Sequence, residues 1–313
     1  MKYAVIPQIK LINAYISIDK PVSVNCMTTG SESKTFLSPD GRVVFFGYDD
    51  FINHIVKGDC CFICGAQPGS KEFNDEHVIP KWLLRRFDLF NQRIVLPNHS
   101  KIPYRQYTVP CCVECNSELS RVFETPISEL LSKPYHEISK ELHENPQLGA
   151  KLFGWLCLLF FKTHLKDTTL RENLHKRTGD DRIGDRHWWG NFHHIHCLIR
   201  SHYTGAKLDE GVFGSIYINR IIDLDRGFDY IDNPLNSAIL VQVDDFCIGG
   251  VLDDAGAAGM MLSNHFSEIN SALAINQFYE IFAHMNYISF NLKERPVFQS
   301  KINSEEGYQI KTI

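Results

Sequence analysis

The stretches CCFIC (60–64) and CCVECN (111–116) each contain the spacing C-x-x-C. Two thiolates at this spacing can turn toward one tetrahedral ion, and two such pairs complete a four-thiolate zinc site. The first cysteine of each pair is doubled, by Cys60 and by Cys111. The four residues with the required spacing, which we expect to bind a structural Zn²⁺ ion, are Cys61, Cys64, Cys112 and Cys115. The alternative is a group of reduced core thiols without metal.

An acid–histidine pair lies between the two cysteine pairs, in DEHVIPKW (75–82). A neutral imidazole can take the proton from an attacking water, because its pKa lies near the working pH. A carboxylate and an amide oxygen suit a hard cation such as Mg²⁺ and leave positions for water and phosphate. Successive strand residues point to opposite faces, so Glu76 and His77 cooperate only where the strand bends or ends. Pro80 is consistent with its ending.

The order C-x-x-C, acid–His–hydrophobic–x–Pro, C-x-x-C-Asn resembles the zinc-containing HNH endonucleases of the ββα-metal (His-Me finger) class. The resemblance covers about residues 58–124. It implies an α+β fold with a zinc-stapled ββα core, in which zinc is structural and catalysis uses Mg²⁺ or Mn²⁺. The site residues that it implies are His77 as general base, Glu76 and Asn116 as ligands of the catalytic cation, and Asn98 (or else Asn91) steadying the metal loop.

Two positions depart from the family pattern. Asp is the commoner acid at the position of Glu76, and Leu119 and Ser120 stand where many members have a histidine or a lysine.

Basic residues follow the acid–histidine pair although the whole chain has a net charge of −5. Cations supply most of the affinity of proteins for nucleic acid and carry no sequence information. A solvated helix face is the other interpretation for each of them. The residues that we expect to contact phosphates are Lys81, Arg85, Arg86 and Arg93.

Three sections are predicted along the chain: 1–55, the nuclease domain at 56–125, and an α+β section of unknown role at 126–313. The first combines a strand-like start (3–18), a hairpin with its turn at Asp40-Gly41, and a short helix after it. The last opens with helices at about 125–138 and 148–165, continues with strands and ends with a helix near 266–286. The predicted strands are 193–201, 214–222 and a hairpin in 237–253.

The histidine-rich segment HWWGNFHHIHCLIRSHY (187–203) has no carboxylate at ligand spacing. Core or surface histidines are therefore expected rather than a second metal site. The isolated cysteines Cys26, Cys157, Cys197 and Cys247 are likewise each expected to be a free buried thiol.

A cytoplasmic protein is expected, because the start has no secretory pattern and the most apolar run (152–161) is too short to span a bilayer. The favoured function is a metal-dependent endonuclease that acts on DNA rather than RNA. The resemblance implies anti-phage defence beside an ATPase partner or another defence protein. The alternatives are a non-catalytic zinc module that binds nucleic acid or a protein, and a resolvase that prefers branched DNA.

Overall fold

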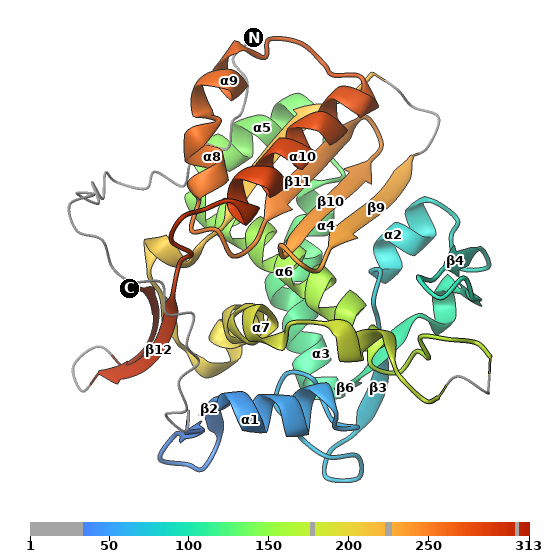
Figure 1. Ribbon diagram of the computed structural model, residues 1–313, viewed down its shortest axis with the longest axis vertical. Coiled ribbons are helices and arrows are strands. Elements are labelled where there is room, and N and C mark those ends of the chain that lie inside the picture. The colour runs from blue at the N-terminus through green and yellow to red at the C-terminus, as the bar shows by residue number, and fades with distance from the viewer. Residues whose placement is uncertain (1–33, 176–178, 223–226, 304–306) are drawn as a thin grey trace.

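The computed structural model describes residues 34–175, 179–222, 227–303 and 307–313. The predicted strand at 3–18 and Cys26 lie outside these residues. Helix makes up 44% and strand 24% of the structure, which confirms the α+β class. In Figure 1 a four-stranded sheet and its covering helix form the upper part, and the cysteine-containing segments form the lower part.

Helix α6 (Pro146–Asp167) runs through the centre of the molecule (Figure 1). It starts where the Asn145 side chain accepts a hydrogen bond from the Leu148 amide (3.2 Å), with Pro146 in its first turn. Its length and hydropathy would allow a membrane span, but 83% of its apolar window is buried inside the protein. A helix that is apolar all round is a core helix in a globular protein, as predicted for 148–165.

Residues 193–201 belong to helix α7 (Trp189–Thr204), which packs along α6. The strand predicted at 193–201 is therefore wrong. Phe192, Ile195 and Ile199 recur at helical spacing and are all buried. The helix ends at Gly205, whose φ of +72° suits a glycine C-cap. The helical period is weak in this sequence because the helix is buried on most sides. A buried helix and a buried strand both have a nearly continuous apolar sequence.

The main sheet is antiparallel with strand order β8-β11-β10-β9. Its strands confirm the predictions at 214–222 and 237–253, with the hairpin turn at Asp244-Asp245. Helix α10 (Ile275–Phe290) covers one face through Phe278 and Met285, and the other face joins the core around α6. The bounds are β8 (Ser215–Arg220), β9 (Phe228–Asn233), β10 (Ala238–Val243) and β11 (Phe246–Val251).

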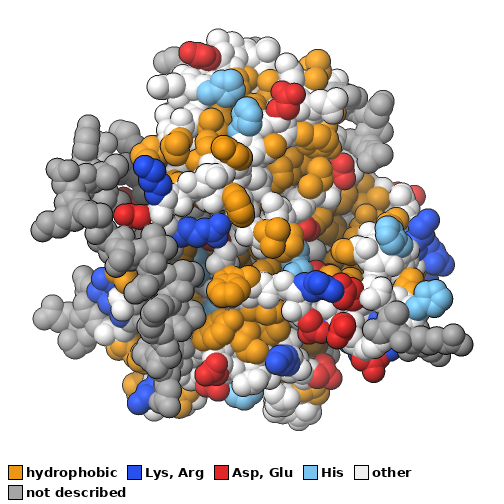
Figure 2. All heavy atoms as spheres, in the orientation of Figure 1, with side chains coloured by type: hydrophobic (Ala, Val, Ile, Leu, Met, Phe, Trp, Pro, Cys, Tyr) orange, Lys and Arg blue, Asp and Glu red, His pale blue; other side chains and the backbone are white. Residues whose placement is uncertain are grey.

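Two predicted helices are interrupted. The helix expected at 125–138 is divided into α4 (Thr125–Leu130) and α5 (Tyr135–Glu144), because Pro134 cannot continue a helix. The helix expected near 266–286 consists of α9 (Ser263–Glu268) and the longer α10. Hydrophobic side chains form orange patches in the upper half of Figure 2. The exposed hydrophobic residues of α8 and α10 are Met260, Met261, Tyr287 and Phe290.

Shorter elements complete the chain. Strands β1 and β2 form the predicted hairpin, in which Gly41 has a φ of +82°, and the predicted short helix follows as α1 and η1. The bounds are β1 (Phe36–Leu37), β2 (Val43–Phe45), α1 (Tyr48–Asp50), η1 (Phe51–Val56), η4 (Ile183–Arg186), β7 (Lys207–Leu208), η5 (Glu210–Val212), α8 (Ala257–Met261), β12 (Phe298–Asn303) and β13 (Gly307–Thr312).

One buried cluster extends from Val44 to Ile310 and includes residues from all three predicted sections. The hydrophobic core is therefore continuous across the predicted boundaries near 55 and 125. This packing places α6 and α7 directly against the segments that carry the cysteines.

Gly154 tests the packing of α6 against the π-helical turn η3 (Ser120–Glu124). A Cβ at this position would lie 2.3 Å from Phe123 Cε1, in a fully buried site. Alanine favours a helix by about 1 kcal/mol over glycine, but overpacking opposes this gain. We expect Gly154→Ala to lower the free energy of unfolding by about 1–3 kcal/mol in urea denaturation. Recovery on adding Phe123→Leu would confirm the contact, whereas a stabilised single variant would contradict it.

Candidate metal centre and acid–histidine strand

The candidate site is built on two antiparallel strands followed by a helix. Strand β3 (Phe73–His77) pairs with β6 (Thr108–Cys112), with Glu76 opposite Val109 and His77 opposite Thr108. Helix α3 (Val113–Leu119) begins at the residue after β6, and its N-cap is Cys112. Between the strands lie α2 (Lys81–Arg86), β4 (Arg93–Val95), β5 (Lys101–Pro103) and η2 (Tyr104–Gln106).

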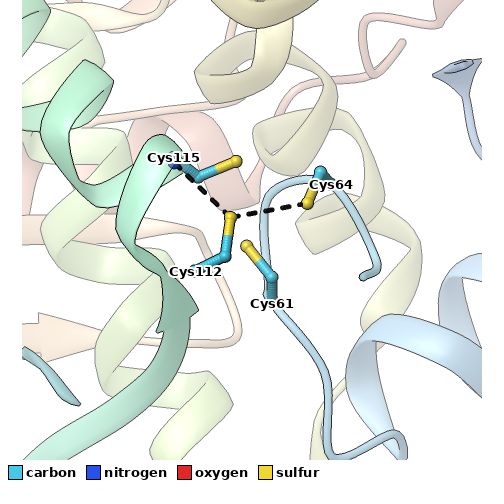
Figure 3. A group of neighbouring side chains, drawn as sticks. All are labelled: Cys61, Cys64, Cys112 and Cys115. Atoms are coloured by element: carbon cyan, nitrogen blue, oxygen red, sulfur yellow. Dashed lines mark hydrogen bonds between the residues drawn. The ribbon is translucent and has the colours of Figure 1, made fainter. Parts of the chain in front are cut away.

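The four predicted cysteines lie together. Their sulfur atoms all lie within 4.8 Å of one another, and Cys64 Sγ is 3.8 Å from Cys112 Sγ. Figure 3 shows Cys61 and Cys64 on a loop facing Cys112 and Cys115 at the junction of β6 and α3. A tetrahedral ion with Zn–S bonds of about 2.3 Å requires sulfur–sulfur distances of about 3.8 Å. The four residues can therefore hold a metal such as zinc.

The protonation of these thiols also suits a metal. Hydrogen bonds from Cys111, Cys115 and Cys64 lower the pKa of the Cys61 thiol, and the same contact with Cys61 raises the pKa of Cys115. A thiolate at Cys61 therefore disfavours a second thiolate at Cys115, since like charges repel at this distance. A divalent cation removes that opposition by holding all four sulfurs as thiolates.

The doubled cysteines are placed differently. Cys60 donates a hydrogen bond to the His54 carbonyl (2.9 Å) and is absent from the four-thiol group. Cys111 is also outside that group, although its Sγ lies 3.8 Å from Cys61 Sγ. The choice of Cys61 and Cys112 from their spacing agrees with the geometry.

Backbone contacts shape the first cysteine loop. The Gly65 amide donates to the Cys61 carbonyl (2.8 Å), and Gly65 has a φ of +76°, which favours glycine. His196 on α7 bonds through Nε2 to the Phe62 carbonyl (2.7 Å), and burial lowers the pKa of this imidazole well below its usual value. A neutral histidine therefore ties α7 to the loop that presents two of the thiols.

Glu76 lies in a buried ion cluster that the sequence did not predict. Its Oε1 accepts a hydrogen bond from Lys162 Nζ on α6 (2.6 Å), and Lys162 also lies 3.4 Å from Glu124. Burial alone would lower the pKa of Lys162, but the two carboxylates raise it above its usual value. Glu76 is 7% exposed and Lys162 is fully buried. A charged lysine in this position compensates the buried carboxylates.

Asn116 meets β3 at Asn74 rather than at Glu76. Its Nδ2 donates to Asn74 Oδ1 (2.8 Å), and Asn74 shares a strand face with Glu76 because it lies two residues away. An open depression lies at this contact. It is lined by Asn74, Asn116, Ser117, Ser120, Arg121 and Thr125.

The donors of this strand face fit a hard divalent cation only in part. Amide and carboxylate oxygens are the right atom types for Mg²⁺. However, Lys162 already bonds to Glu76, and the amide of Asn116 is engaged with Asn74. A cation that used Glu76 would share its carboxylate with an ammonium group, so no catalytic step is assigned to a cation here.

His77 is the last residue of β3, as expected from Pro80. Its ring packs edge-on against Phe90, and its buried Nδ1 has no hydrogen-bond partner among the described residues. Burial and the neighbouring Lys81 lower the pKa of His77. The side chains of His77 and Glu76 point to opposite faces of the strand. The backbone carbonyl of His77 accepts a hydrogen bond from Lys162 (2.8 Å).

The two asparagines considered for the metal loop hold loops together. Asn98 Nδ2 donates to the Arg171 carbonyl (2.7 Å), and its Oδ1 accepts a hydrogen bond from the Ser100 amide (2.9 Å). Asn91 accepts a hydrogen bond from Arg105 (2.6 Å). Both side chains thus have structural partners.

The predicted phosphate-binding residues divide into two groups. Lys81, Arg85 and Arg93 are exposed, and Figure 2 shows blue side chains at the right edge of the molecule, over β4. Arg86 is exposed as well, but it donates to the Leu131 carbonyl (2.8 Å) and forms an ion pair with Asp244. Arg86 therefore links α2 to the hairpin of the main sheet.

No family model, curated protein or solved structure matches this chain. The resemblance to HNH endonucleases thus rests on the motif residues of the sequence.

Sequence reasoning missed Lys162 and Asn74. A lysine inside the apolar run of α6 was the available signal for the first, because a buried charge needs a partner. The position of Asn74 two residues before Glu76, on the same strand face, was the signal for the second.

Zinc content tests the four-thiol centre. We expect the purified wild-type chain to hold zinc there and Cys112→Ser to lose that ion, because three thiolates and a hydroxyl bind more weakly. Cys60→Ser is the matched control, since Cys60 is a buried neighbour outside the group. Elemental analysis with thiol titration measures both. Equal zinc loss in the two variants would contradict the assignment.

Lys162 tests the buried ion cluster. Lys162→Met leaves two carboxylates buried without their cation, so the free energy of unfolding should fall by about 3–5 kcal/mol. Adding Glu76→Gln should recover part of this loss, because one uncompensated charge is removed. Denaturation of the single and double variants measures the effect. A single variant as stable as the wild type would show that the cluster carries no such energy.

Proposed function

We propose that this protein is an HNH-type endonuclease that hydrolyses phosphodiester bonds, with DNA as the favoured substrate. One observation carries the proposal: β3, β6 and α3 form a strand–strand–helix unit with the four-thiol centre at one end. The acid–histidine pair ends its first strand, and Asn116 follows its last cysteine. This arrangement supports the proposal because it brings the motif residues into one strand–strand–helix unit.

His77 has the properties that a general base requires. Its pKa is lowered, so the imidazole is neutral and can accept a proton from water at neutral pH. The step would transfer a proton from water to the imidazole while the water oxygen attacks phosphorus, the bond from phosphorus to the 3′-oxygen breaks, and the 3′-oxygen takes a proton from solvent. A Mg²⁺ or Mn²⁺ ion, if bound, would stabilise the leaving oxygen.

Electrostatics at the surface support a polyanionic substrate. Lys81, Arg85 and Arg93 are exposed, and Lys81 lies close enough to His77 to lower the pKa of that imidazole. Arg121 lines the depression beside Asn116, where it is paired with Glu118. Such cations attract phosphates without reading sequence. These basic side chains are grouped in this region although the chain is acidic overall.

One observation favours a second candidate, a zinc module that binds nucleic acid or a protein without cleaving it. Glu76 forms an ion pair with Lys162, and such a buried pair can stabilise the fold without taking part in catalysis. The two candidates differ in what the loss of His77 would do.

Replacing His77 distinguishes an enzyme from a binding module. If His77 is the general base, His77→Ala should slow cleavage of plasmid DNA by about 10²–10⁴-fold, with zinc content and DNA affinity unchanged. The matched control is His54→Ala, an exposed histidine of the same region. Gel assays and filter binding provide the readouts. Cleavage at the wild-type rate by His77→Ala would overturn the proposed mechanism, and binding without cleavage by the wild type would favour the module.

A further inference from the structure

A second group of metal-binding side chains lies at the C-terminal end of α6. His164 and Asp167 are one helical turn apart, and His187 follows the 3₁₀ turn η4. His164 Nδ1 lies 3.1 Å and His187 Nε2 lies 2.8 Å from Asp167 Oδ2. One ligand atom from each residue lies within 4.8 Å of both others. The histidine-rich segment therefore does meet a carboxylate, one that comes from α6.

Asp232 on β9 influences which ring nitrogen of His164 carries the proton. Its Oδ1 lies 3.7 Å from His164 Nε2, a buried nitrogen with no hydrogen-bond partner among the described residues. A proton on Nε2 would face this carboxylate and leave a lone pair on Nδ1, directed at Asp167. In this tautomer the Nδ1 lone pair lies 3.1 Å from Asp167 Oδ2, and a cation between the two atoms would remove their repulsion. In the other neutral tautomer Nδ1 donates a hydrogen bond to Asp167, and no cation is needed. Metal-binding histidines commonly have such a carboxylate behind them.

The ion pairs in the pocket also favour a bound cation. The side chains of Asp167 and Asp232 are 5% and 21% exposed, and the ion pairs found for them within the described residues are with histidine. Both carboxylates of the pocket therefore face imidazole nitrogens, which is the side-chain arrangement of a histidine–carboxylate metal site.

Aromatic rings enclose the group. His164 packs edge-on against Phe160 (ring centroids 4.4 Å), and His187 stacks on Phe192 (5.7 Å). The imidazoles are therefore held in place by packing, so that little side-chain entropy is lost when a ligand binds.

We propose that His164 Nδ1, His187 Nε2 and Asp167 bind a second divalent metal ion of the zinc class, with Asp232 orienting His164. Two imidazoles and one carboxylate form a donor set typical of zinc and related transition metals. The ion would join α6, the segment before α7 and, through Asp232, strand β9. This site is separate from the four-thiol centre and does not depend on the nuclease function.

The competing explanation is a metal-free hydrogen-bond network in which His164 Nδ1 and His187 Nε2 donate to the Asp167 carboxylate. Both explanations satisfy the hydrogen-bond geometry. They differ in the number of metal ions bound by the folded chain and in the ligands of the second ion.

Cobalt titration of the metal-free full chain distinguishes them. The first Co²⁺ should produce the thiolate charge-transfer absorption of the four-cysteine centre. A second equivalent should add visible absorption without further charge transfer and should raise the thermal midpoint. A wild-type chain that saturates at one cobalt ion would overturn the proposal.

Variants locate the second ion. His187→Ala should bind only one Co²⁺ and keep the charge-transfer band, which also reports that the chain is folded. Asp232→Asn should keep two ions but weaken the second by about 10–100-fold in competition with a chelator. The control His265→Ala, at an exposed histidine on α9, should bind two ions as the wild type does. Should His187→Ala fail to fold, Asp232→Asn decides: unchanged affinity for the second ion would count against the site.

Discussion

The four cysteine sulfurs impose the constraint on which the candidate site depends. They join a loop near residue 61 to the junction of β6 and α3, about fifty residues later, and this junction sets the position of Asn116 relative to β3. A tetrahedral ion requires all four sulfurs within narrow distances. A metal held there would couple the folding of this region to metal binding and would position the helix and both strands together.

The second determinant is Lys162, which connects this unit to the core helix. Its ammonium group bonds to Glu76 and to the carbonyl of His77, so α6 contacts both members of the acid–histidine pair. Glutamate has one methylene more than aspartate, and the carboxylate of Glu76 reaches Lys162 at 2.6 Å. This contact gives the longer side chain a structural role. It also explains why Glu76 stands apart from Asn116, since its carboxylate is turned toward α6.

The local parts of this structure could be predicted from sequence, and the tertiary contacts could not. The C-x-x-C spacing identifies Cys61, Cys64, Cys112 and Cys115, because a tetrahedral ion leaves little choice of spacing. Pro80 and the Asp40-Gly41 turn also behave as expected, since both act through backbone geometry. By contrast, Lys162 meets Glu76 across 86 residues, and His164 with Asp167 meets His187 across the α6–α7 connection. No spacing rule joins residues so far apart. Helix α7 was misassigned because its buried β-favouring residues obscure the helical period.

The nature of the cleaved ends tests the central claim most directly. Zinc-loaded wild-type protein would be incubated with plasmid DNA and with RNA, in Mg²⁺, in Mn²⁺ and in EDTA, and the product termini would be determined by end-labelling. Attack of water on phosphorus with departure of the 3′-oxygen predicts 5′-phosphate and 3′-hydroxyl ends, formed in Mg²⁺ or Mn²⁺ and suppressed by EDTA. Intact DNA and RNA in every condition, with zinc bound at the four cysteines, would contradict the account.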